Sequence, residues 1–318
     1  MEELQRENSS EFTTFIFLQL VDSLELQVLL FCAFLLVYIF TLTGNYLIIV
    51  ITVTNTSLHT PMYFFLRILS ILDIVYSSVT TPKILLNLLM EDRSISYIGC
   101  AAQMYFLIFL GSTECILLAV MAYDRYMAIC NPLKYTVHMN QRVCQSFSLL
   151  SVVIGNLVSL VQTIWVFNLP LCGSNKIDYF FCDILPFLKL SCADTSMFEI
   201  QLLTATVLVI VTPFILILIS YILIISSILL MTSDVGKWKT FSTCSSHIVV
   251  VILYYGVSSF IYTKPKYIFS EGTSKVISLI YTTVTPMLNP AIYSIRNKEV
   301  QGALKKKIEE WKIFLHGD

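Results

Sequence analysis

The sequence has few charged side chains for its length. Only 13% of its 318 residues are Asp, Glu, Lys or Arg, while 56% are hydrophobic and the mean hydropathy is +0.77. A soluble globular domain carries roughly 25% charged residues. This chain cannot cover a water-facing surface with charge, which excludes a soluble globular protein and indicates an integral membrane protein.

The sequence also lacks the short motifs of common enzymes. It contains no glycine-rich phosphate-binding loop, no metalloprotease motif and no nucleophile elbow. Cys244 and His247 lie close together, but no third or fourth ligand accompanies them, so no metal site is expected. With no internal repeat and no low-complexity stretch, we expect one domain over residues 1–318 that is not an enzyme and holds no cofactor.

Long apolar runs divide the chain into seven segments, each as long as the ~20 residues that a helix needs to cross a bilayer. The segments are 26–58, 61–90, 94–123, 143–175, 200–233, 240–263 and 276–295. They predict an all-α membrane protein with a seven-transmembrane-helix bundle over residues 26–295. Residues 1–25 precede the bundle. Residues 296–318 form a tail with a predicted short amphipathic helix.

The charges between these segments predict the orientation of the chain. With the N-terminus outside, the cytoplasmic parts carry eleven basic and six acidic residues, and the outer parts carry seven basic and thirteen acidic residues. Basic residues accumulate on the cytoplasmic side, so an outside N-terminus is favoured. Residues 1–25 show no cleavable signal pattern, and the first segment is expected to act as a signal-anchor. Asn8 begins an Asn-Ser-Ser glycosylation sequence on the outer side.

Four cysteines are expected on the oxidising outer side. Cys100 lies at the outer end of the third segment, and Cys172, Cys182 and Cys192 lie at intervals of ten residues in the loop expected after the fourth membrane helix. Two disulfides are compatible with this placement, but four cysteines allow three pairings and the spacing does not choose among them. The other five cysteines are predicted to be free thiols.

Two carboxylates are predicted near the middle of the bilayer. Asp73 lies about four turns into the second segment, and Glu114 lies at a comparable depth in the third. Carboxylates at that depth need partners. The candidates are each other, Asn45, Asn289, a sodium ion held by oxygen ligands, or a proton.

The inner end of the third segment carries the adjacent pair Asp124-Arg125. The pair is compatible with a membrane-edge anchor and with a functional switch. The last segment contains Pro286 and Pro290, and prolines four residues apart free backbone carbonyls and bend a helix. Bending of that helix would let the polar side chains of Asn289 and Tyr293 rearrange.

Five motifs in this order resemble one known family over nearly the whole chain. They are residues 58–66 (LHTPMYFFL), 121–130 (MAYDRYMAIC), 220–221 (SY), 239–247 (KTFSTCSSH) and 286–290 (PMLNP). Together they are similar to the vertebrate olfactory receptors, which are rhodopsin-like (class A) G-protein-coupled receptors. The departures are slight: Met127 and Thr240 stand where the family commonly has Val and Ala, and Arg67 where it often has Ser.

The resemblance implies a function and a set of roles. An odorant receptor binds a small volatile ligand within the helix bundle. It then activates a stimulatory, olfactory-type heterotrimeric G protein, which raises cyclic AMP, in the plasma membrane of olfactory sensory neuron cilia. The implied switch residues are Asp124, Arg125, Tyr126, Tyr221, Asn289, Pro290 and Tyr293. The implied mid-membrane network joins Asn45, Asp73 and Glu114 to Asn289, and the implied disulfides are Cys100–Cys182 and Cys172–Cys192.

The resemblance also implies a pocket between the third, fifth, sixth and seventh segments. Its residues would be Leu107, Ile108, Gly111, Ser112, Ala205, Val209, Tyr255, Ser258, Ser259, Tyr262 and Thr282. None of these is acidic or basic, so we expect a neutral, mostly apolar ligand with at most one or two polar atoms. Broad tuning is expected as well, because an apolar pocket discriminates one methylene by only ~1–3 kcal/mol.

Other seven-helix proteins fit the sequence less well. A retinal protein needs a lysine midway along the last segment, and residues 276–295 contain none. Transporters and channels usually show internal repeats or polar residues along several segments. A rhodopsin-like receptor for amines carries an acid in the outer half of the third segment, where this chain has Leu107.

Overall fold

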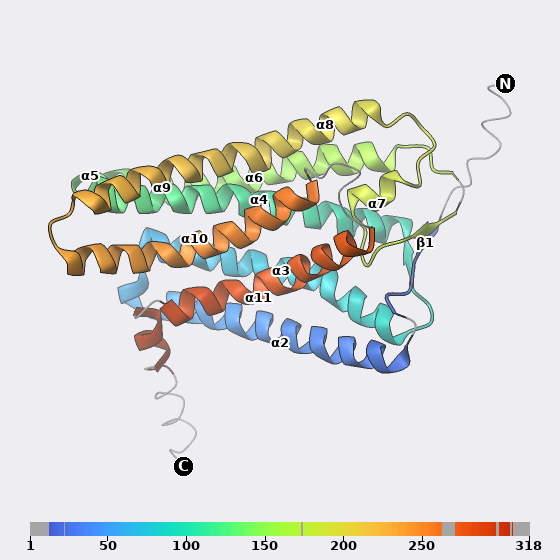
Figure 1. The fold of residues 1–318 in the computed structure, drawn as a ribbon, viewed down its shortest axis with the longest axis horizontal. Coiled ribbons are helices and arrows are strands. Elements are labelled where there is room, and N and C mark those ends of the chain that lie inside the picture. The colour runs from blue at the N-terminus through green and yellow to red at the C-terminus, as the bar shows by residue number, and fades with distance from the viewer. Residues whose placement is uncertain are drawn as a thin grey trace, which may run out of the picture.

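Long helices that run along one common direction make up most of the structure, a computed structural model that describes residues 13–21, 23–172, 174–262, 271–296, 299–305 and 307 (Figure 1). The long helices are α2 (Leu24–Thr54), α3 (Pro61–Leu89), α4 (Tyr97–Cys130), α6 (Gln141–Phe167), α8 (Ser196–Thr206), α9 (Thr212–Leu230), α10 (Asp234–Tyr262) and α11 (Glu271–Arg296). A π-helical turn, η2 (Val207–Val211), joins α8 to α9. The short helix α5 (Pro132–His138) connects α4 to α6.

Five helical stretches of the described chain are long and apolar enough to cross a membrane. They are α2, α3, α4, α6 and the continuous run Ser196–Leu230. The helix α10 contains a shorter apolar stretch, Cys244–Ser259, and α11 packs against it. The chain is therefore a multi-pass helical membrane protein. The expected sixth and seventh segments correspond to α10 and α11.

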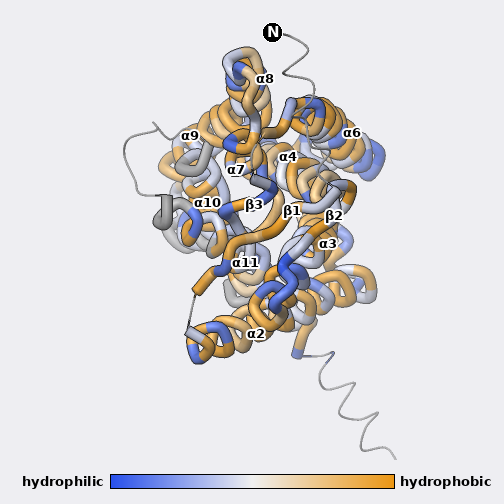
Figure 2. Tube along the Cα trace, turned by 90° about the vertical axis from the view of Figure 1, so that its right-hand side faces the viewer, coloured by the Kyte–Doolittle hydropathy of each residue, from blue (hydrophilic) through white to orange (hydrophobic). Residues whose placement is uncertain are grey.

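The bundle carries apolar side chains on its outer surface as well as inside. Leu29, Phe40, Ile222 and Leu229 are each more than half exposed. Figure 2 looks along the bundle and shows hydrophobic stretches on its peripheral helices, among them α2, α6 and α9. A surface of this kind is compatible with lipid and costly in water.

Local sequence signals explain where several helices begin. Pro61 occupies the first turn of α3, where its missing N–H would have no helical partner. The Ser96 hydroxyl accepts a hydrogen bond from Gly99 N at the start of α4. At the start of α6, Asn140 Oδ1 accepts one from Val143 N. These side chains satisfy N–H groups that the first helical turn leaves free.

A proline in α11 explains how α2 packs against it. Pro290 has no N–H, so the carbonyl of Pro286, one turn earlier, loses its helical hydrogen bond. Asn45 Nδ2 donates to that carbonyl at 3.0 Å. The neighbouring Gly44 permits the approach, because a Cβ at that position would lie 3.1 Å from Pro290 Cγ. A small residue beside an amide thus joins the first and last long helices.

A small layer of strands and loops covers one end of the bundle (Figure 1). It consists of β1 (Thr14–Phe17), β2 (Ser94–Ser96), β3 (Lys176–Ile177) and the short helix α7 (Ile184–Leu188). The central strand β1 pairs antiparallel with β2 and parallel with β3. We call this layer the outer cover. Its central strand comes from the segment that precedes the first long helix, for which the sequence predicted no strand.

Two disulfides hold the outer cover. Cys100 is bonded to Cys182, and Cys172 to Cys192, with Cα–Cα distances of 5.4 and 5.7 Å. The Gln103 amide holds the segment around the Cys100–Cys182 disulfide in place. Its Oε1 accepts a hydrogen bond from Cys182 N at 2.9 Å, and its Nε2 donates one to Val79 O. The loop that contains Cys182 is thereby fixed to α4 and, through Gln103, to α3.

An acidic side chain of the outer cover begins α7. Asp183 Oδ1 accepts a hydrogen bond from Ile184 N at 2.7 Å. Burial of this carboxyl group raises its pKa to about 6, and the bond from Ile184 N opposes the rise. Its cap holds Ile184 above the interior of the bundle.

Candidate functional site

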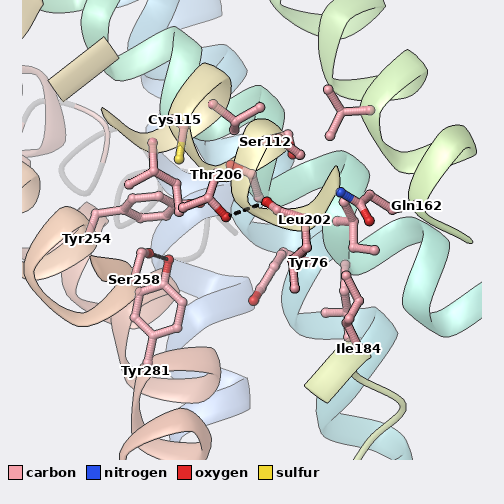
Figure 3. A pocket seen from close by; sticks show the side chains of 17 residues that line it. Tyr76, Ser112, Cys115, Gln162, Ile184, Leu202, Thr206, Tyr254, Ser258 and Tyr281 are labelled. Atoms are coloured by element: carbon pink, nitrogen blue, oxygen red, sulfur yellow. Dashed lines mark hydrogen bonds between the residues drawn. The ribbon is translucent and has the colours of Figure 1, made fainter. Parts of the chain in front are cut away.

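A cavity lies inside the bundle, between α4, α6, α8, η2, α10 and α11 and below α7 (Figure 3). Its volume is about 100 Å³, well above the ~10–15 Å³ that one water molecule occupies on the same measure. The described residues that line it are Tyr76, Leu107, Ile108, Gly111, Ser112, Cys115, Val158, Gln162, Ile184, Leu202, Ala205, Thr206, Val209, Ile210, Tyr254, Ser258 and Tyr281.

Seven of the predicted pocket residues line this cavity. Helix α4 contributes four of them, α8 and η2 contribute two, and α10 contributes one. They are Leu107, Ile108, Gly111, Ser112, Ala205, Val209 and Ser258. The structure therefore brings together most of the residues that the resemblance assigned to ligand binding, although they come from three separate parts of the chain.

The other four predicted pocket residues are not placed at the cavity. Tyr255 packs toward α4, where its hydroxyl donates to Cys115 O at 2.6 Å. Thr282 donates to the carbonyl of Ser278 within α11. Ser259 is not among the cavity residues, and the side chain of Tyr262 lies outside the described part of the structure.

Ten cavity residues were not predicted. Those with polar side chains are Tyr76, Cys115, Gln162, Thr206, Tyr254 and Tyr281, and the apolar ones are Val158, Ile184, Leu202 and Ile210. Gln162 carried a sequence signal, since a long amide in the charge-free fourth segment is costly in lipid unless it faces the interior. No comparable signal distinguished Tyr76 or Tyr281 from tyrosines that pack between helices.

The cavity wall is neutral and mostly apolar. No acidic or basic side chain occurs among the described residues that line it. Several of its hydroxyls are engaged by the protein: Tyr254 donates to Gly111 O at 2.8 Å, and Ser258 donates to the hydroxyl of Tyr281 at 2.9 Å. Figure 3 shows the Ser258–Tyr281 pair at the α10 and α11 side of the cavity. The wall can therefore hold an apolar ligand but offers no countercharge to an ionised one.

Deeper in the bundle, three polar side chains meet. Asn289 Nδ2 lies 3.1 and 3.0 Å from the two oxygens of Asp73 and 3.4 Å from Glu114 Oε1. All three residues are buried. Asn45, assigned to the same network by the resemblance, bonds to the Pro286 carbonyl instead. Helices α3, α4 and α11 are thus joined by hydrogen bonds between the cavity and the far end of the bundle.

The far end of α4 carries the Asp124-Arg125 pair, and both residues are buried. Asp124 Oδ1 accepts a hydrogen bond from the hydroxyl of Tyr135 in α5 at 2.9 Å. The next residue along the motif, Tyr126, is half-buried. The structure therefore connects Asp124 to the α4–α6 connection, a contact that the sequence did not indicate.

Helices α9, α10 and α11 bring further predicted switch residues to this end. Tyr221 and His247 form a hydrogen bond of 2.6 Å between the hydroxyl and Nδ1. Tyr293 is buried on α11. Arg125 Nε and the Tyr293 hydroxyl have no hydrogen-bond partner within the described residues. Buried polar groups are normally paired, so unpaired ones mark a place where another arrangement can be favoured.

A second cavity of about 360 Å³ lies at the same end as Arg125, between α3 and α6. Its wall includes His59, Arg67, Met139 and Gln141. Although larger, it is formed by the ends of helices rather than by the bundle interior. None of the predicted pocket residues lines it, and the first cavity is therefore the better candidate for a ligand site.

Two further expectations concern modification and metals. The predicted glycosylation residue Asn8 lies outside the described residues. Within the described residues no three His, Cys, Asp or Glu side chains gather as a metal site would require. The five remaining cysteines, Cys32, Cys115, Cys130, Cys144 and Cys244, are free thiols.

Comparisons with known sequences place this arrangement in a class. A bundle of apolar helices with a cavity between them is compatible with a multi-pass membrane receptor. A family model described as Olfactory receptor matches residues 34–311. The chain belongs to the olfactory receptor family, and its function is that of an odorant receptor.

Individual relatives match along nearly their whole length. Human olfactory receptor 10A7 is 50% identical over 304 residues, which cover 96% of each chain. Human olfactory receptor 10A5 is 52% identical over 300 residues, 94% of this chain and 95% of the relative. Human olfactory receptor 10A3 is 48% identical over 315 residues, 98% and 99% of the two chains. These relatives are receptors, not enzymes.

Proposed function

We propose that this receptor binds a small, neutral, mostly apolar odorant in the cavity between α4, α6, α8, η2, α10 and α11. The bound state would then activate a stimulatory heterotrimeric G protein at the Arg125 end. The observation that carries the proposal is the neutral, largely apolar wall of a cavity that seven predicted pocket residues line. Burial of apolar ligand surface supplies the binding energy, at ~25 cal/mol per Å².

The proposal includes the orientation of the chain. Residues 1–318 form one seven-transmembrane domain, with the N-terminal residues 1–25 outside, glycosylated at Asn8, and residues 296–318 in the cytoplasm. Two observations support it: the disulfides gather at the end that carries the outer cover, and the basic residues of the connections gather at the other end. Its location in the cilia of olfactory sensory neurons follows from family membership.

The proposed mechanism is a shift between two states of the bundle. Ligand at the outer cavity favours a state in which the inner end of α10 moves away from Arg125, and the G protein binds the opened surface. The ligand shifts the balance only by the difference between its affinities for the two states. The cavity and the inner end share α4, and Asp73, Glu114 and Asn289 lie between them. The unpaired Arg125 Nε and Tyr293 hydroxyl supply groups that can change partners.

An odorant panel tests this function. Cells that express the receptor with the olfactory G protein are expected to raise cyclic AMP in response to neutral volatiles of small size. Aliphatic amines and carboxylates of matched chain length are expected to be inactive, because the wall offers no countercharge. Activation by the charged compounds alone would contradict the assignment of the cavity.

A further inference from the structure

We propose that Gln162 is the polar anchor of the odorant cavity and that the cognate ligand carries a hydroxyl group. The hydroxyl oxygen accepts a hydrogen bond from Gln162 Nε2, and the hydroxyl hydrogen is donated to Gln162 Oε1. The inference rests on the proposed function and narrows the ligand to alcohols and phenols. Gln162 lies on α6, outside the segments to which ligand binding was assigned from the sequence.

The amide of Gln162 is buried without a protein partner. The residue is 1% exposed, and neither its Oε1 nor its Nε2 has a hydrogen-bond partner within the described residues. Figure 3 shows its side chain extending from α6 beside the cavity, and Gln162 belongs to the cavity wall. An amide that is buried without hydrogen bonds destabilises the protein, because it has lost its contacts with water and gained none in return. A ligand in the cavity can remove that cost.

Neighbouring contacts fix Gln162 in this position. One turn earlier on α6, Ser159 donates a hydrogen bond to the carbonyl of Tyr105 at 2.5 Å, and Asn156 Nδ2 donates to the Tyr105 hydroxyl at 2.7 Å. These bonds hold α6 against α4 at the level of the cavity. The side chain of Gln162 is therefore presented on a rigid helix pair rather than on a mobile loop.

Three other hydroxyls of the wall already donate to the protein. Thr206 donates to Leu202 O at 2.9 Å, Tyr254 to Gly111 O and Ser258 to the Tyr281 hydroxyl. Their oxygens can accept a further bond, but their hydrogens are engaged. The amide of Gln162 combines two N–H donors with a carbonyl acceptor in one group, and both functions are unused by the described part of the chain.

This combination discriminates between chemical classes of ligand. A hydroxyl both accepts and donates, so it can satisfy Nε2 and Oε1 together. A ketone or ester only accepts and would leave Oε1 buried and unpaired. An alkane would leave both atoms unpaired. An ionised carboxylate or ammonium group would lose its hydration, and a neutral amide does not repay that loss.

The test compares ligands built on one carbon skeleton, namely 1-hexanol, 2-hexanone and hexane, extended to longer homologues and to phenols. In cyclic AMP dose–response curves on the wild-type receptor, alcohols or phenols are expected to act at roughly 10- to 100-fold lower concentrations than the matched ketone. Gln162→Leu keeps the size of the side chain and removes its polar atoms. It is expected to remove this advantage while leaving surface expression and the response to apolar agonists intact.

Gln201→Leu is the matched control. Gln201 is a glutamine of α8 whose Oε1 is likewise buried without a partner among the described residues, but it does not line the cavity. Its replacement is expected to leave the order of alcohol, ketone and alkane unchanged. If Gln162→Leu shifts all ligand classes equally, or shifts none, the anchoring role is wrong. If ketones outperform alcohols on the wild type, the ligand class is wrong.

The outcomes separate this inference from the proposed function. Activation by neutral odorants without any dependence on Gln162 overturns the anchor and leaves the odorant cavity standing. No cyclic AMP response to any neutral odorant, in cells where a control odorant receptor responds, overturns the proposed function, and the inference falls with it.

Discussion

Arg125→Ala is expected to abolish odorant-stimulated cyclic AMP while the receptor still reaches the cell surface. Arg125 is 5% exposed and lies at the end of α4 that is away from the outer cover, beside the part of α10 that is proposed to move. In the proposed mechanism, removal of the guanidinium group removes a contact with the G protein and a group that stabilises the active arrangement. The measurement is maximal cyclic AMP in response to an activating odorant, normalised to surface receptor by antibody labelling of intact cells.

The structure explains why this substitution should spare folding. Asp124, next to Arg125, accepts a hydrogen bond from the Tyr135 hydroxyl, and the substitution leaves this bond in place. Arg125 Nε has no partner in the described chain, so the alanine variant leaves no broken bond at that atom. Arg142→Ala is the control, because Arg142 is an exposed basic residue at the start of α6. Signalling retained by Arg125→Ala would show that the residue is only a membrane-edge anchor.

Gly155→Val is expected to prevent most of the receptor from reaching the surface. Gly155 lies where α6 crosses α4, and a Cβ there would lie 2.9 Å from the carbonyl oxygen of Phe109 and 3.0 Å from Thr113 N. Both contacts are backbone atoms, so a whole helix must move. Overpacking typically costs ~1–3 kcal/mol, and a loss of ~1–2 kcal/mol changes cellular abundance several-fold.

The matched control for this prediction is Gly256→Val. Among the residues that the structure describes, none lies within 4 Å of a Cβ added to Gly256 in α10. Both substitutions place the same β-branched residue in a helix of the same protein, so the difference between them reports the α4–α6 contact. Surface labelling of the two variants measures it. Equal surface levels would mean that the helices do not cross as closely as the structure shows.

The sequence predicted the helical segments because apolar length is a local property. The Gly44-Asn45 pair, a small residue beside an amide, is suited to close contact with another helix, but the sequence did not indicate that this helix is α11. The sequence could not predict which group accepts the hydrogen bond from the Asn45 amide. Recognition of the Pro286 carbonyl requires knowing both that Pro290 frees it and that α2 lies opposite.

The residues of the candidate site could be predicted only in part, because the sequence does not show which way a side chain points. Residues such as Ser112 and Val209 were assigned through matching positions in the family, and the structure places them at the cavity. Tyr255 and Thr282 carry similar hydroxyls but bond to backbone carbonyls instead. A hydroxyl in a span does not reveal whether it faces a cavity or a neighbouring helix, because rotation of the helix by one residue exchanges the two.

The strands of the outer cover could not be predicted from the sequence for a different reason. Its central strand β1 is only four residues long, and Phe15 and Phe17 are buried while Thr14 and Ile16 are exposed. The alternation is a strand signal, but four residues are too few to separate it from chance. Its partners, β2 and β3, lie far along the chain, so the pairing depends on the fold of the bundle itself.

The most direct test of the central claim is to locate a bound odorant. A photoreactive analogue of an activating neutral odorant, irradiated on the receptor in membranes, should label the cavity stretches of α4 and of α8–η2, residues 107–115 and 202–210. Excess parent odorant should suppress that labelling in proportion to its potency in the cyclic AMP assay. Suppressible labelling confined to the outer cover, or to the second cavity near Arg67, would contradict the claim that odorants act from inside the bundle.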